Sequence, residues 1–235
     1  MNFKYMYVDL VRCNYNPLKW VNRRIEGIKR GKAKDYPEIT VVSKDRIKTS
    51  YGIFYDSNSC NLDILRQVEN EYRYDDIRSD DVLMDIGANV GMFSLKLRDK
   101  LSHIYAVEPL FFEELDKNIK MNGAWFRTHI ITYGLGNEDQ EITFDGKTQF
   151  IKCKTLSQLF KLAEVPITFL KLDCEGGEWC IKPEELKGIR RIEAEVHNFD
   201  GRNPQDFVNM LIECGFRVIS EVQSDGMTMV HAYRN

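Results

Sequence analysis

The sequence contains the run Val82-Leu83-Met84-Asp85-Ile86-Gly87-Ala88-Asn89-Val90-Gly91, followed by His103-Ile104-Tyr105-Ala106-Val107-Glu108-Pro109. The first run has the pattern of a buried strand that ends in a glycine turn and opens a helix. The second has the pattern of a neighbouring strand that ends in an acid. Together they predict a doubly wound sheet that binds a ligand made of a charged chain and a ribose.

The glycine turn and the acid suit the two ends of such a ligand. Gly87 and Gly91 leave room for backbone N–H groups to approach it, and the helix N-terminus beyond them favours an anion such as an amino-acid carboxylate. Glu108 follows the turn by about 20 residues, the distance at which doubly wound sheets place the acid that binds ribose hydroxyls. We therefore expect Glu108 to hold a ribose.

Two features of the turn argue against a dinucleotide. The fingerprint G-x-G-x-x-G needs its middle glycine so that a pyrophosphate can touch the backbone, whereas this chain has Gly87-Ala88-Asn89-Val90-Gly91. Asp85, just before the turn, would repel a pyrophosphate and could accept hydrogen bonds from an ammonium group. Both features favour S-adenosylmethionine (SAM), which has a zwitterionic tail and a positive sulfonium.

Further motifs extend this pattern towards the C-terminus, namely Val107-Glu108-Pro109, Thr155-Leu156-Ser157-Gln158-Leu159 and Leu170-Lys171-Leu172-Asp173-Cys174-Glu175-Gly176-Gly177-Glu178. With them, the chain from about Thr49 onward resembles the class I SAM-dependent methyltransferases and, specifically, the FkbM family of O-methyltransferases. The last motif is the narrowest and carries the family assignment. The resemblance implies SAM-dependent methyl transfer to a hydroxyl of a sugar, glycolipid or related small metabolite.

Short apolar or β-branched runs alternate with segments of helical spacing from residue 82 onward. The predicted strands are 82–87, 103–108, 129–133, 167–173 and 191–196, and the predicted helices are 92–100, 111–121, 156–163 and 178–186. A helix over 204–214 precedes two strands, 216–222 and 227–233, joined by an Asp-Gly turn. This order predicts an α/β fold with a doubly wound, mostly parallel seven-stranded sheet (Rossmann-like, class I methyltransferase) and a C-terminal antiparallel hairpin.

Residues 1–78 lack this alternation and are predicted to form an N-terminal α+β extension or substrate cap, with 79–235 as the SAM-binding domain. Basic side chains between Arg12 and Lys34 interleave with apolar ones at helical spacing. Such a helix could pack on the catalytic domain, which we favour, or lie on a membrane surface or a phosphate backbone. Residues 51–55 read as a strand of a small hairpin.

Composition favours a cytoplasmic enzyme. The 235 residues are 43% hydrophobic and 29% charged, enough for one sizeable core with an extension. The net charge of −3 provides no general attraction to nucleic acid. The 6 cysteines contain no C-x-x-C pair, which favours free thiols in a reducing compartment. No apolar run approaches a membrane span, so no transmembrane segment is expected.

The predicted catalytic residues are Asp173, Glu175 and His197, because ligands in open α/β sheets bind beyond the carboxyl ends of the strands. Any of the three could take the proton of an acceptor hydroxyl. Lys171 is expected to form an ion pair with Asp173 or Glu195 rather than to act in catalysis. The predicted cofactor-binding residues are Asp85, Gly87, Asn89, Gly91, Glu108 and, near the adenine edge, Asn137.

Several alternatives stay open at this level. An RNA methyltransferase of the 2′-O type would use the basic N-terminal segment to bind phosphates, and a non-catalytic nucleoside-binding module would keep only the cofactor residues. The acids and His197 also include ligand types that suit Mg²⁺ or Mn²⁺, but no spacing supports a metal site and none is assigned. The acceptor and the oligomeric state have no readable pattern.

Overall fold

The computed structural model describes residues 40–43, 46–55, 62–144, 147–198, 200–223 and 227–234. The basic N-terminal segment expected to form a helix lies outside these residues. Two compact units are separated between Glu71 and Tyr72. No helix in the described part of the chain is long and apolar enough to cross a bilayer.

In its described residues, the first unit contains a three-stranded antiparallel sheet and one helix. Its strands are β1 (Thr40–Ser43), β2 (Arg46–Lys48) and β3 (Ile53–Tyr55), and its helix is α3 (Leu62–Asn70). Ile47 of β2 lies opposite Phe54 of β3, and both side chains are buried. The strand expected over 51–55 is therefore confirmed as part of a hairpin.

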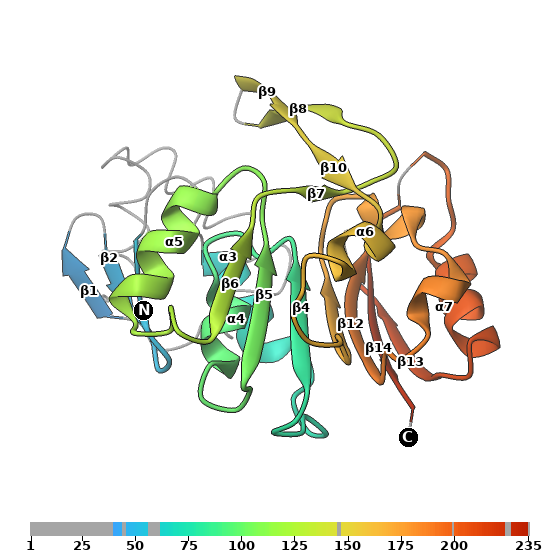
Figure 1. Ribbon diagram of the computed structural model, residues 1–235, viewed down its shortest axis with the longest axis horizontal. Coiled ribbons are helices and arrows are strands. Elements are labelled where there is room, and N and C mark those ends of the chain that lie inside the picture. The colour runs from blue at the N-terminus through green and yellow to red at the C-terminus, as the bar shows by residue number, and fades with distance from the viewer. Residues whose placement is uncertain are drawn as a thin grey trace. The chain divides into compact units, whose positions relative to one another are not determined.

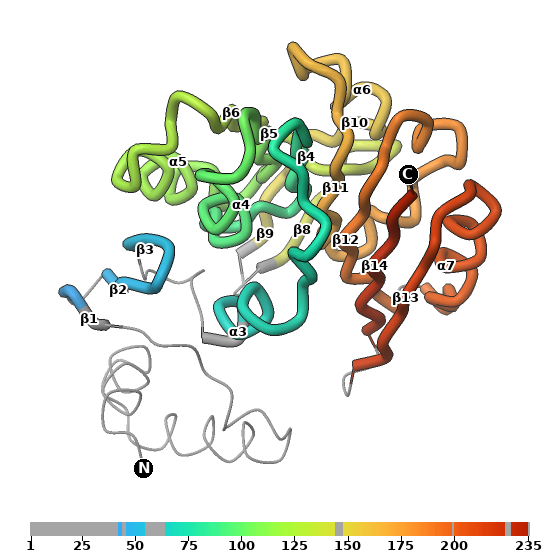
Figure 2. Tube along the Cα trace, turned by 90° about the horizontal axis from the view of Figure 1, so that it is seen from below, coloured from blue at the N-terminus to red at the C-terminus, as the bar shows by residue number. Residues whose placement is uncertain are grey.

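The second unit is built on a seven-stranded sheet in the order β13-β14-β12-β11-β4-β5-β6 (Figures 1 and 2). The strands are β4 (Val82–Ile86), β5 (His103–Val107), β6 (Thr128–Ile131), β11 (Phe169–Leu172), β12 (Arg191–Val196), β13 (Arg217–Val222) and β14 (Thr228–Tyr233). β14 runs antiparallel to both of its neighbours, while the other pairs are parallel. This confirms the predicted mostly parallel sheet with its C-terminal hairpin.

The two faces of the sheet differ in character. The helices of this unit are α4 (Met92–Leu97), α5 (Phe112–Met121), α6 (Leu156–Phe160) and α7 (Pro204–Glu213). On one face, Met84 and Leu170 join Leu159 of α6 and Leu211 of α7 in an apolar core. On the other face, the register-matched residues Asp85, Lys171 and Glu193 are all buried. Buried charges need partners, so this face is where a functional arrangement is expected.

The single helix predicted over 178–186 is wrong. The chain instead forms two 3₁₀ helices, η2 (Gly177–Cys180) and η3 (Pro183–Leu186), with Ile181 and Lys182 in extended conformation between them. Pro183 explains the break, because a proline has no N–H to donate and disfavours helical conformation in the residue before it.

Residues 134–154 form strands that the sequence pattern does not reveal. β7 (Gly134–Leu135) pairs in parallel with β10 (Cys153–Lys154), and β8 (Gln140–Phe144) forms a hairpin with β9 (Lys147–Ile151). In Figure 1 these strands lie above the main sheet, on the side where its parallel strands end. They therefore border the region in which a ligand of this fold is expected.

Candidate active site

The glycine turn after β4 packs directly on the loop after β11. Gly87, Asn89 and Gly91 have φ angles of 78°, 50° and 87°. A Cβ atom added to Gly87 would lie 1.7 Å from the backbone oxygen of Asp173. The backbone N–H of Asp173 also donates to the oxygen of Ile86, at 3.0 Å. Gly87 is thus required by the close approach of two loops, which brings Asp173 beside the turn.

The N–H groups of the turn are bonded within the protein. Those of Gly87 and Ala88 donate to the oxygen of Val107, and that of Gly91 donates to the oxygen of Ala88. The N–H of Val90 donates to the side-chain oxygen of Asn89, at 2.8 Å. The expectation that these groups face an anion is therefore not matched by this geometry. These N–H groups are therefore occupied by partners within the turn and at the end of β5.

Glu108 fastens the turn to the start of α5. Its Oε2 accepts the N–H of Asn89 at 2.8 Å, and its Oε1 accepts those of Leu110 and Phe111 at 2.7 and 3.0 Å. Burial raises the pKa of Glu108, although these three bonds act to lower it. A carboxylate offers about four lone-pair positions, so Oε2 can accept a further bond. The fixed carboxylate therefore fits a ribose hydroxyl.

Asp85 is fully buried beneath the turn. Its Oδ2 accepts the hydroxyl of Ser94 at 2.7 Å, and its Oδ1 lies 3.4 Å from the ammonium of Lys171. These contacts connect Asp85 to other side chains rather than to an open surface. A direct bond from Asp85 to a SAM ammonium stays a prediction, and the geometry favours an indirect role.

Lys171 joins the two loops through its ammonium group. It donates to the backbone oxygen of Gly87 at 2.9 Å and to Oδ2 of Asp173 at 3.3 Å, and it lies 3.4 Å from Oδ1 of Asp85. Burial acts to lower the pKa of Lys171, but the charges of Asp173 and Asp85 outweigh it and raise this pKa above its ordinary value. An ammonium has three N–H donors, so these partners account for all of them. Lys171 is a charged structural link.

Asp173 is partly exposed, with 24% of its side chain accessible. Its Oδ2 accepts bonds from Lys171 and from the hydroxyl of Tyr72, each at 3.3 Å. Tyr72 was not among the predicted site residues, because it lies between Asn70 and Val82, where no periodic pattern marks it as buried. A tyrosine ahead of a buried strand gives no signal of its partner 101 positions away.

The remaining predicted catalytic residues, Glu175 after β11 and His197 after β12, lie close together with Glu178. His197 Nδ1 lies 3.1 Å from Oε1 of Glu178, and Nε2 lies 3.5 Å from Oε2 of Glu175. Glu178 is fully buried, whereas 84% of the Glu175 side chain is exposed. Burial acts to lower the pKa of His197, but the hydrogen bond and charge of Glu178 raise it to about 9. A protonated imidazole cannot accept a proton at neutral pH, which favours Asp173 as the base.

The His197–Glu178 pair predicts a pH-dependent stability. Because the pKa of His197 rises from its ordinary value of 6.5 to about 9 in the folded protein, the pair stabilises fully below pH 6.5 and loses its contribution as pH rises through 9. The free energy of unfolding should fall by up to roughly 3 kcal/mol over this interval. Urea unfolding at pH 6, 8 and 10 measures it. His197→Gln should remove most of the decrease, and an equal decrease in both proteins would contradict the pairing.

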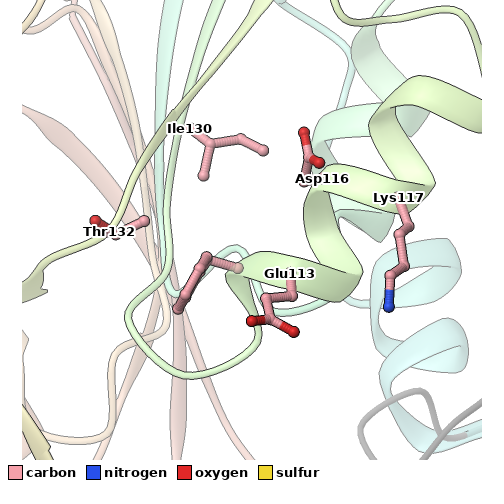
Figure 3. A pocket seen from close by; sticks show the side chains of 6 residues that line it. Glu113, Asp116, Lys117, Ile130 and Thr132 are labelled. Carbon is pink, nitrogen blue, oxygen red and sulfur yellow. The ribbon is translucent and has the colours of Figure 1, made fainter.

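Asn137 and a surface groove lie apart from these contacts. Asn137 is exposed in the bend after β7. Figure 3 shows the groove, which is lined by Phe112, Glu113, Asp116, Lys117, Ile130 and Thr132 of α5 and the end of β6. The groove shares no lining residue with the predicted site. The structure thus brings Asp85, Glu108, Asp173 and His197 to four neighbouring strands or the residues directly after them, and it gives no contact between Asn137 and these residues.

Comparison with known proteins identifies a family model that matches the chain. A family model described as the methyltransferase FkbM domain matches residues 85–218, which is more than half of the chain. Among solved structures, the FkbM methyltransferase from Methylobacillus flagellatus KT is 17% identical with a TM-score of 0.49, and the match covers 69% of this chain and 45% of that one. This chain thus spans less than half of that protein.

Two other solved structures also match part of the chain. Fibrillarin from Aeropyrum pernix, in complex with SAM, is 10% identical with a TM-score of 0.46, covering 70% of this chain and 71% of its own. Magnesium protoporphyrin IX methyltransferase from Synechocystis PCC 6803, with bound SAM, is 14% identical with a TM-score of 0.46, covering 68% and 72%. No curated protein sequence matches significantly. On the family match, the chain belongs to the FkbM family of SAM-dependent methyltransferases.

Proposed function

We propose that this protein transfers the methyl group of SAM to a hydroxyl of a sugar, glycolipid or related small metabolite. One observation carries the proposal: the turn after β4 lies between two carboxylates. Asp173 packs its backbone on Gly87, and Glu108 accepts the N–H of Asn89. Ligands of doubly wound sheets bind at this position, beyond the carboxyl ends of the strands.

In this proposal, residues at and beside the turn would hold the cofactor. Oε2 of Glu108 accepts a ribose hydroxyl, since it retains acceptor capacity beside its bond from Asn89. Gly87 and Gly91 set the path of the turn, and Asp85 supports it through Lys171, which donates to the oxygen of Gly87. The remaining proposed contact is that of Asn137 with the adenine edge.

The chain's own groups then act on the acceptor. SAM, when bound, supplies a methyl group on a positively charged sulfur. Asp173 would accept the proton of the acceptor hydroxyl as the new oxygen–carbon bond forms and the bond from that carbon to the sulfur breaks, which leaves the neutral thioether S-adenosylhomocysteine. We propose that Glu175, whose side chain is exposed, hydrogen-bonds a second hydroxyl of the acceptor. His197 is a cation that holds Glu175 and Glu178 in place.

A transfer assay tests the class of acceptor. The protein is incubated with methyl-labelled SAM and separate glycan, glycolipid and RNA fractions of the cells that produce it. We expect label in the glycan or glycolipid fraction, with little dependence on salt. Label confined to RNA, with binding that weakens steeply as salt rises, would replace the proposal by RNA methylation. SAM binding without transfer to any fraction would indicate a nucleoside-binding module.

A further inference from the structure

Tyr72 is a buried residue whose one polar atom points at the proposed base. The side chain is 4% exposed, and its hydroxyl donates to Oδ2 of Asp173 at 3.3 Å. Its ring packs edge-to-face on Phe93 of α4, with centroids 4.9 Å apart. Because a tyrosine ring has few rotatable bonds, this packing fixes the position of the hydroxyl.

Lys171 approaches the same oxygen from the strand. Its ammonium lies 3.3 Å from Oδ2 of Asp173 and is itself held by the backbone oxygen of Gly87. Both donors therefore meet Oδ2, and no described residue donates a hydrogen bond to Oδ1. The side chain of Asp173 keeps 24% of its surface exposed. The two oxygens of this carboxylate thus have different environments.

We infer that Tyr72 and Lys171 are positioning residues that hold Oδ2 of Asp173 and leave Oδ1 as the atom that takes the acceptor proton. This inference rests on the proposed function, since it assigns the proton to Asp173. Neither residue needs to touch the substrate. Their effect is to fix the direction of the free oxygen and to stabilise the ionised carboxylate.

Asp173 interacts with charged and polar groups from several elements. Among the described residues, four groups interact electrostatically with Asp173, namely Lys171 on β11, Tyr72 ahead of β4, Cys174 on the loop after β11 and His197 directly after β12. Burial, followed by the charges of Asp173 and Glu195, raises the pKa of Tyr72 well above its ordinary value. Its hydroxyl therefore remains a donor at any working pH.

Titration of Asp173 in the full chain tests the inference without any acceptor. Carboxyl ¹³C NMR of aspartate-labelled protein follows the resonance of Asp173, identified by its loss in Asp173→Asn. In Tyr72→Phe, which keeps the ring on Phe93, we expect the titration midpoint to rise by about 0.5–1 pH unit, since a donor to the charged form is lost. The matched control is Tyr74→Phe, because Tyr74 also packs on Phe93. An unchanged midpoint in Tyr72→Phe would overturn the inference.

The transfer rate provides the second readout. The acceptor is the fraction that the transfer assay identifies. With it, Tyr72→Phe should lower kcat roughly tenfold and move the acid limb of the pH profile to higher pH. The affinity for SAM should stay unchanged. A lower kcat with an unmoved acid limb would indicate packing alone and overturn the inference. A different result would show that the proposed role of Asp173 itself is wrong. In that case Asp173→Asn keeps full transfer activity, and this outcome does not depend on the titration in Tyr72→Phe.

Discussion

Replacing Asp173 with asparagine should reduce kcat for methyl transfer by roughly 10²–10⁴-fold, the usual contribution of a positioned base. Asparagine has nearly the same volume, and its amide oxygen can still accept from Lys171 and Tyr72. It cannot take a proton from a hydroxyl. SAM affinity should change little, because the proposed ribose contact belongs to Glu108 on a different strand. Labelled-methyl transfer and calorimetry measure the two quantities.

Asp99→Asn is the matched control for this variant. Its side chain is 84% exposed, and the substitution removes the same charge. We expect wild-type transfer from it. Retention of more than about half of the activity in Asp173→Asn would show that proton transfer does not depend on this carboxylate. Equal losses in both variants would point to a general effect of charge.

Glu108→Gln should weaken SAM binding by roughly 10–100-fold, which corresponds to about 1.5–3 kcal/mol for a hydrogen bond to a charged acceptor. Glutamine keeps one acceptor oxygen. Its amide nitrogen, however, would face an N–H group that donates to the carboxylate in the wild-type protein. The turn at Asn89 or the start of α5 at Phe111 must then lose its partner. Calorimetric titration with SAM measures the change, and thermal unfolding reports whether the fold is retained.

Glu113→Gln provides the comparison, since Glu113 is exposed in the first turn of α5 and lines the groove of Figure 3. We expect it to bind SAM as the wild type does. If Glu113→Gln loses affinity while Glu108→Gln keeps it, the cofactor lies in the groove on α5 and not beside the turn.

The main sheet was predictable because burial imposes a pattern on it. β4 is buried along its whole length, and the acid that follows β5 marks the end of a neighbouring strand. The C-terminal hairpin had a turn signal of its own. By contrast, β7 to β10 are short strands with mixed exposure, and η2 and η3 depend on one proline within an otherwise helical pattern. Local periodicity does not determine such segments.

The site was only partly predictable. The acids after β5 and β11 follow from the general position of ligands in this kind of sheet, and the structure brings Asp173 and the glycine turn into contact. Tertiary packing decides which groups form hydrogen bonds with each site residue. The sequence alone therefore predicts neither the hydrogen bonds that occupy the N–H groups of the turn nor the contact of Tyr72 with Asp173. The pKa of His197 likewise depends on Glu178, whose burial only the folded structure reveals.

A crystal structure with SAM bound is the most direct measurement. We predict that the ribose hydroxyls lie within hydrogen-bond distance of Oε2 of Glu108, with the methyl group on the side of the turn that carries Asp173. Cofactor density in the groove between α5 and β6, or anywhere away from both carboxylates, would contradict this site.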